Sequence, residues 1–477
     1  MQQIFLLFGI LLVIIRLYLN FSTDLVLGLN GGYYPLQVRS VLETGWLGFP
    51  DMPLYFFVNA FFVKIASIFT SLDDSLILFI NKIVDSFSLA FIVIPFYYFY
   101  KKYAPNNLTN RFQIASIAFA TLSITPLLLT AGIQKNAAAM PLLVLFVFQL
   151  FQFLDTKSRK AFWFASLSLL LTGLTHFGVF SVALLYLFAS LLVFYKKKAI
   201  IPVIGIGIIS LGFVFLFDAS RAIRLLQSAF LLIQRPALLT GHFAPMLFFN
   251  ILIGFPIIGY GIKQIRQGKL DNKPFQKNIL IINYIVFFIL SFPLMSHDFA
   301  MRLSLMAFIP FFMMTLLTGQ FFSKRLFNIT TVILTIIVVG SVIRTILKPK
   351  NTAIPYEAYE DLEKLATTID TKNTLIIAKH GLEWWTAWQT RAKVGQETAI
   401  DKSTFSKYET VISLSIKETN NHNFHPTPFP NPYAPNTKPL YESDYFKAVE
   451  VTIDDLEAIQ KSASQRRRPD RKKRPHE

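Results

Sequence analysis

The chain has 477 residues, of which 53% are hydrophobic and 16% are charged, with a formal net charge of +18. A soluble domain carries roughly a quarter charged residues, and long apolar runs recur here from Phe5 to Leu347, so the composition excludes an ordinary soluble protein and indicates a polytopic membrane protein. The positive charge does not indicate nucleic-acid binding, because it lies in short loops between apolar runs and in the tail 465–477.

The first apolar run, residues 3–19, lacks a basic leader and a small-residue cleavage site, so we expect a retained first span. The first outer loop, residues 20–75, follows it. Within that loop, residues 54–70 are apolar enough to span, but Lys64 lies in their middle. A Lys at the bilayer centre costs about 2.5–3.5 kcal/mol, so we interpret this segment as an amphipathic or re-entrant helix.

The later apolar segments predict an all-α polytopic protein of about eleven spans. The N-terminus is then inside and residues 348–477 are outside, because the basic loops fall on the cytoplasmic side. After the first span, the predicted spans are 76–99, 112–131, 137–154, 161–174, 177–195, 199–217, 244–262, 278–295, 303–321 and 328–347. Together with the loops between them, they form a transmembrane domain over residues 1–350 of a multi-pass plasma-membrane protein.

The C-terminal part changes character and predicts a small extracytoplasmic α/β domain over residues 351–420. EAYEDLEKLATTI and GLEWWTAWQTRAK have helical spacing, whereas NTLIIAKH and YETVISLSIK read as strands. Residues 421–477 are expected to be a Pro/Asn-rich linker and a disordered basic tail. The domain has no Gly-rich phosphate loop, so we expect a docking or lid role.

The first outer loop carries the most informative residues of the sequence. An Asp after the first span, a Tyr pair, an Arg-containing helix, a Gly turn and a Pro-Leu helix start follow one another, at Asp24, Tyr33–Tyr34, Arg39, Gly45 and Pro53–Leu54. This order resembles the GT-C glycosyltransferases, which include protein O-mannosyltransferases, the aminoarabinose transferase of lipid A and oligosaccharyltransferase catalytic subunits. The resemblance implies a polyprenyl-phosphate or polyprenyl-diphosphate sugar donor used at the outer face of the membrane.

One departure from that family concerns the acid. Many relatives place an acid directly before the tyrosine pair, in the position that Asn30 occupies in NGGYY. An amide cannot act as a base, so the catalytic role falls on Asp24 or, as second choice, on Asp51. For Asp24 the alternative is a helix-end or capping role. No Asp-x-Asp pair follows the third span, so we expect neither a metal nor another cofactor.

Sugar transfer from a phosphate ester needs a base for the acceptor hydroxyl and cations for the departing phosphate. The candidate substrate-binding residues are Asn30, Tyr33, Tyr34, Arg39, Lys135, His176, His297 and Arg302. Lys135 and Arg302 could instead snorkel at span ends, and His176 could be a hydrogen-bonded interfacial residue. Gly31 and Gly32 are expected to form a tight turn with positive φ.

The sequence therefore predicts an integral membrane glycosyltransferase that moves a sugar from a polyprenyl-phosphate donor to a glycan, lipid or protein acceptor. Its partners are membrane lipids and those substrates, without nucleic acid. Two alternatives stay open: a transporter or flippase for lipid-linked saccharides, and a non-catalytic scaffold of the same fold. A transporter needs ionisable groups near the midplane or broken helices, whereas a scaffold fits the amide at Asn30.

Overall fold

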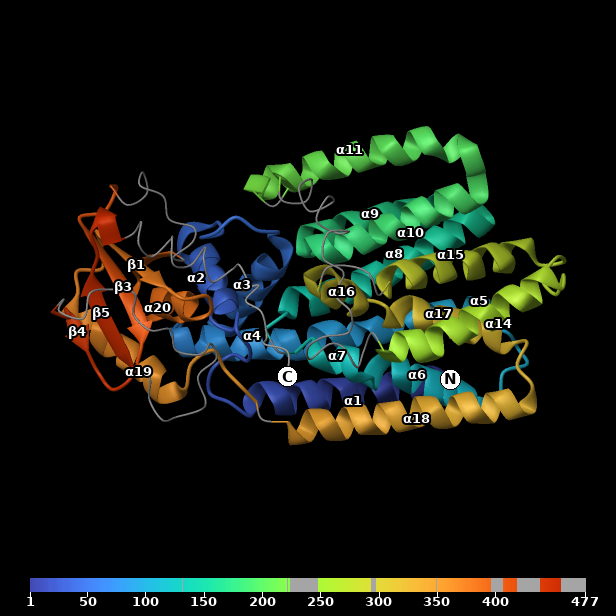
Figure 1. Cartoon of the computed structure of the whole chain (residues 1–477), viewed down its shortest axis with the longest axis horizontal. Helices are drawn as coiled ribbons and strands as arrows, with labels where there is room; N and C mark the ends of the chain where they lie inside the picture. The colour runs from blue at the N-terminus through green and yellow to red at the C-terminus, as the bar shows by residue number, and fades with distance from the viewer. Residues whose placement is uncertain are drawn as a thin grey trace, which may run out of the picture. The chain divides into compact units, whose positions relative to one another are not determined.

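The computed structural model describes residues 1–130, 132–220, 222–223, 248–292, 297–348, 350–395, 406–417 and 438–455. The chain divides into two compact units (Figure 1). The first unit comprises Met1–Asn20, Phe49–Leu72 and Phe79–Lys348. The second comprises Phe21–Gly48, Asp73–Leu78 and Pro349–Glu477.

The first unit is helical, with most of its long helices side by side in a bundle (Figure 1). Its α-helices are α1 (Gln2–Phe21), α3 (Leu54–Ala66), α4 (Asp74–Ser88), α5 (Val93–Tyr103), α6 (Asn110–Leu122), α7 (Ile124–Leu128), α8 (Gln134–Thr156), α9 (Arg159–Thr175), α10 (Phe177–Tyr195), α11 (Ile200–Phe217), α14 (Phe255–Arg266), α15 (Pro274–Leu290), α16 (His297–Ser304), α17 (Phe308–Gly319) and α18 (Lys324–Leu347). The first turn of α4, up to Leu78, belongs to the second unit. Short turns of other helix types join some of them, at η1 (Leu89–Ile92), η2 (Lys196–Ala199) and η3 (Asn250–Gly254).

Several of these helices are long and apolar enough to cross a bilayer. Among the described residues there are 6 such segments, at Gln2–Phe21, Asp74–Tyr103, Asn110–Leu128, Gln134–Thr156, Phe177–Phe217 and Lys324–Leu347. The prediction of a mostly helical polytopic membrane protein is therefore confirmed, while the number of about eleven crossings and their orientation stay predictions. Helix α3 has 13 residues, and at 1.5 Å per residue it is about 20 Å long, shorter than a hydrocarbon core of about 30 Å.

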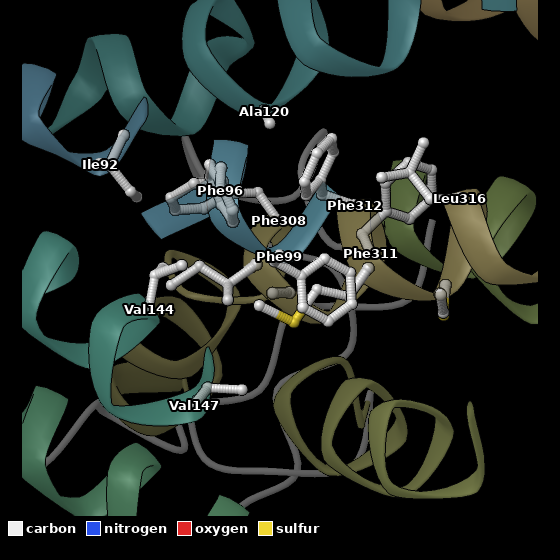
Figure 2. Close-up of a cluster of buried hydrophobic side chains, with 14 of the residues drawn as sticks. Ile92, Phe96, Phe99, Ala120, Val144, Val147, Phe308, Phe311, Phe312 and Leu316 are labelled. Carbon is white, nitrogen blue, oxygen red and sulfur yellow. The ribbon is translucent and has the colours of Figure 1, made fainter. Parts of the chain in front are cut away.

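The core of the first unit combines phenylalanine with leucine and other aliphatic side chains (Figure 2). The ring of Phe96 on α5 lies 4.6 Å from Phe312 and 6.5 Å from Phe308, both on α17, measured between centroids. Apolar side chains also face outward: Ile201 and Leu216 of α11 are 82% and 81% exposed. Exposed apolar helix faces of this kind suit lipid as the surrounding solvent.

The second unit contains a five-stranded sheet with the order β2-β1-β3-β5-β4. Its strands are β1 (Thr374–Ala378), β2 (Lys393–Gly395), β3 (Thr410–Ile416), β4 (Tyr441–Glu442) and β5 (Phe446–Glu450). Strand β1 is parallel to β2 and β3, whereas β5 is antiparallel to β3 and β4. The helices of this unit are α2 (Tyr33–Thr44), α19 (Tyr356–Thr368) and α20 (Leu382–Thr390).

The two helices and two strands predicted in residues 351–420 are present as α19, β1, α20 and β3. The sheet nevertheless continues beyond residue 420, because β5 pairs with β3 along Ile412↔Glu450 to Ile416↔Phe446. The predicted end of the domain at residue 420 is therefore too early. The predicted linker 421–437 and the tail 456–477 lie outside the described residues.

Candidate functional site

The predicted site residues of the first outer loop fall into both units. Asp24, Asn30, Tyr33, Tyr34 and Arg39 belong to the second unit. The other predicted residues belong to the first unit, namely Asp51, Lys135, His176, His297 and Arg302.

Arg39, on α2, binds the C-terminal end of α20. Its guanidinium donates hydrogen bonds to the carbonyl oxygens of Trp388 at 2.7 Å and Ala387 at 3.0 Å, and it lies 4.2 Å from the centroid of the Trp388 ring. Burial, with a smaller contribution from the nearby Arg391, lowers the pKa of Arg39 to about 10. A cation at this place satisfies the free carbonyls of a helix end and complements its dipole.

The glycine pair before α2 also serves packing within the second unit. Gly32 has φ −69°, and the positive-φ glycines nearby are Gly28 and Gly45, so the predicted positive-φ turn at Gly31–Gly32 is wrong. A Cβ at Gly32 would lie 2.9 Å from Cδ2 of Trp385, and a Cβ at Gly31 would overlap a backbone carbonyl oxygen. The pair is therefore required by close approach and not by backbone conformation.

The remaining residues of this group differ in exposure. Tyr34 is 4% exposed, and the Tyr33 ring lies 4.9 Å from Trp384 on α20. Asn30 is half-buried, while Asp24 is exposed. Tyr33 and Arg39 thus both contact α20.

In the first unit, the structure brings two predicted residues together. The ammonium group of Lys135 forms a buried ion pair with Oδ2 of Asp51, and their side chains are 8% and 2% exposed. Oδ1 of Asp51 accepts the backbone N–H of Met52 at 2.8 Å. Nζ of Lys135 also lies 5.2 Å from the centroid of the Phe56 ring on α3. Asp51 is consequently held by both a cation and a backbone donor.

The start of α8 is rich in hydrogen-bond donors. Gln134 is fully buried, and its Oε1 accepts the hydroxyl of Tyr55 at 2.8 Å. Its Nε2 is buried without a hydrogen-bond partner in the part of the chain that the structure describes. Ile133 at the N-cap has no side-chain acceptor to offer. The first-turn N–H groups, the Gln134 amide and the Lys135 ammonium suit an anion such as a phosphate.

A second buried ion pair joins α1 to α4. Arg16 donates to Asp85 Oδ1 at 2.7 Å, both side chains being 0% exposed, and to Oγ1 of Thr130 at 3.1 Å. Asn20 donates to the other carboxylate oxygen of Asp85 at 2.8 Å. Sequence reasoning missed this pair, although an Arg and an Asp inside two apolar runs are the signal that marks functional or paired intramembrane charges.

Side-chain amides connect α3 to α4. Asn59 Nδ2 donates to the Tyr55 carbonyl oxygen at 2.8 Å, and Asn81 Nδ2 lies 3.4 Å from Asn59 Oδ1. The adjacent Lys82 is buried as well. These groups and the two ion pairs make up what we call the polar layer, namely Arg16, Asn20, Asp51, Tyr55, Asn59, Asn81, Lys82, Asp85, Thr130, Gln134 and Lys135. Buried polar groups of this density are costly unless they are paired or functional.

An apolar cluster adjoins Asp51. Met52 packs with Val214 of α11 and Ala222, and Phe177 contacts the same cluster. Asp218, directly after α11, is buried at 7% exposure and was missed by sequence reasoning. His176 precedes Phe177 and caps α10, where its Nδ1 accepts a backbone N–H at 3.2 Å. His176 thus makes the kind of hydrogen bond that its alternative interpretation described, and its role in substrate binding stays a prediction.

The last two predicted residues lie on α16. Arg302 is exposed. His297 begins the helix, but its side chain lies outside the described residues. Within the described ranges, no group of three or more His, Cys, Asp or Glu side chains is arranged to hold a metal ion.

The fold is shared with ArnT, an aminoarabinose transferase, so the resemblance indicated by the first outer loop is confirmed at the level of fold. The chain is similar to the crystal structure of ArnT from Cupriavidus metallidurans bound to undecaprenyl phosphate, with a TM-score of 0.51 and 9% sequence identity. The match covers 94% of this chain and 98% of that chain. No family model matches the sequence, and no curated protein matches it. The likeness is thus one of fold.

Proposed function

We propose that this protein transfers a sugar from a polyprenyl-phosphate donor to a hydroxyl group of an acceptor at the outer face of the membrane. The observation that carries the proposal is the buried start of α8, where Gln134 and Lys135 present donors beside the Asp51 carboxylate. The fold shared with ArnT supports it. That relative was crystallised with undecaprenyl phosphate, from which we infer a polyprenyl phosphate as the carrier here.

In the proposed reaction, Asp51 accepts the proton of the acceptor hydroxyl. The acceptor oxygen forms a bond to the anomeric carbon, and the bond from that carbon to the phosphate oxygen breaks. The electron pair stays on the phosphate, whose negative charge increases by one unit. Lys135, Gln134 and the first-turn N–H groups of α8 stabilise that charge, since fixed donors are most effective where charge develops.

We propose Asp51 as the base ahead of Asp24. A base needs fixed geometry close to the reacting atoms. Asp51 is buried, its carboxylate accepts the backbone N–H of Met52, and it lies beside the cation Lys135, whereas Asp24 is exposed.

The test uses purified full-length protein in lipid nanodiscs, a polyprenyl-phosphate sugar as donor and mass spectrometry of the products. We expect transfer from the lipid-linked donor and little from a nucleotide sugar. Asp51→Asn should lower the rate about 10²–10⁴-fold, whereas Asp24→Asn should retain most of it. If Asp24→Asn abolishes transfer and Asp51→Asn does not, the order of the two acids is reversed. If a panel of lipid-linked donors and acceptors gives no transfer, the non-catalytic scaffold becomes the better description.

A further inference from the structure

We propose that the donor phosphate displaces Asp51 from Lys135, so that the base becomes available only when a donor is bound. This inference rests on the proposed function. It concerns the order of events at one buried ion pair, in which Lys135 serves first as the counter-ion of Asp51 and then as that of the phosphate.

The state without donor has Lys135 bound to Asp51, with both side chains almost fully buried. A carboxylate paired with an ammonium is a weak proton acceptor, because the cation stabilises its charged form. As long as this pair persists, Asp51 is poorly suited to take the proton of a hydroxyl. The pair also restrains Lys135 from binding another anion.

An anion that reaches the start of α8 finds other donors in place. Gln134 Nε2 is buried without a partner among the described residues, and its orientation is fixed because Oε1 accepts the Tyr55 hydroxyl. Lys135 is the next residue, in the first turn of a helix of 23 residues. A phosphate bound to Gln134 and to the first-turn N–H groups therefore competes with Asp51 for the same ammonium.

The competition favours the phosphate more as the reaction proceeds. A polyprenyl-phosphate sugar is a diester with one negative charge, and cleavage of its sugar–oxygen bond leaves a monoester with a second charge. Asp51 becomes neutral when it takes the acceptor proton. The ammonium of Lys135 is therefore attracted more strongly to the phosphate and less strongly to Asp51 as the sugar–oxygen bond breaks. Because this gain appears only as charge develops, it stabilises the transition state more than the bound donor.

The test measures equilibrium binding of undecaprenyl phosphate to the full chain in nanodiscs. Asp51→Asn should bind it about tenfold more tightly than the wild type, since a buried Lys135 without its carboxylate gains most from a new anion. The same variant should lose transfer activity. Lys135→Gln should bind about tenfold more weakly, and Asp51→Asn combined with Lys135→Gln should bind as weakly as Lys135→Gln alone.

A matched control removes the carboxylate that is paired with a different lysine. Asp155 lies 3.2 Å from Lys102, and both are about one-third exposed, so Asp155→Asn should leave binding unchanged. Wild-type protein gives a second readout that needs no folded variant: carbodiimide labelling of Asp51, followed by mass spectrometry, should rise with undecaprenyl phosphate but not with undecaprenol. If the wild type binds and transfers, two results would overturn this inference but not the proposed function. One is labelling of Asp51 that does not change with undecaprenyl phosphate, and the other is Asp51→Asn binding no more tightly than the wild type. A wild type that neither binds nor transfers overturns the proposed function as well.

Discussion

Arg39 offers the sharpest test of how the first outer loop is used. Arg39→Met leaves the carbonyls of Ala387 and Trp388 without their donor, at about 1–3 kcal/mol each. It also removes a cation–π contact at 4.2 Å, worth about 1 kcal/mol. The methionine no longer has to bury a charge, which offsets part of the loss. We expect the second unit to lose about 3 kcal/mol, or about 9 °C at about 3 °C per kcal/mol.

The tryptophans of the chain allow unfolding of the second unit to be followed separately. Four of its 5 tryptophans belong to the second unit, and Trp163 is the one in the first unit. In a Trp163→Phe background, thermal unfolding followed by tryptophan fluorescence reports the second unit alone. The pKa of Arg39 of about 10 keeps it protonated from about pH 6 to about pH 8, so the difference from Arg39→Met should stay constant over that range.

Two further variants complete the test. Arg39→Lys should lose about half as much, because a single ammonium cannot serve two carbonyls and stack on the ring as a guanidinium does. Glu43→Gln removes an exposed pair, with Arg391 at 2.6 Å and side chains 55% and 49% exposed, and should change stability by less than about 0.5 kcal/mol. If Arg39→Met keeps the wild-type midpoint but loses transfer activity, then Arg39 binds donor and the packing interpretation fails.

Three other outcomes are expected. Gly31→Ala should lower the free energy of unfolding of the second unit by about 1–3 kcal/mol, since the added Cβ would overlap backbone. Gly45→Asn, at φ 78°, should be tolerated because Asn adopts that conformation; equal effects of the two substitutions would contradict this. Arg16→Met should cost the first unit about 3–5 kcal/mol by leaving Asp85 buried without its cation, and Arg16→Met with Asp85→Leu should recover most of it in a detergent thermostability assay. Transfer should retain most of its rate in a chelator, and a strict requirement for Mg²⁺ or Mn²⁺ would point to an acidic ligand overlooked in the first outer loop.

The sequence predicts regular elements well where periodicity and composition agree. The helix at α19 and the strands β1 and β3 follow from amphipathic spacing and short apolar runs. Strand β5 was missed because a Pro/Asn-rich stretch separates it from β3, and such a stretch usually ends a domain. Its partner is set by long-range pairing along Ile412↔Glu450, which local patterns do not reveal.

The sequence identified individual residues of the candidate site but not which of them lie together. Asp51 and Lys135 are both recognisable as charges near apolar segments, yet they lie 84 positions apart. Arg39 was predicted to bind substrate, but it binds a helix end, because a guanidinium suits phosphate oxygens and helix-end carbonyls equally well. The residue type alone cannot distinguish these two partners. Only the packing of α20 against α2 decides between them.

The first outer loop thus serves both units, and this explains its unusual polarity. Its early part, from the glycine pair to Arg39, is shaped by close packing against α20. Its later part brings Asp51 to the start of α8. Asp51 is buried beside a cation and an amide donor that has no hydrogen-bond partner among the described residues. An exposed acid relies on water for its charge, whereas a buried acid depends on specific partners that a substrate can replace. That dependence is why a change in the counter-ion of Asp51 can control when it acts.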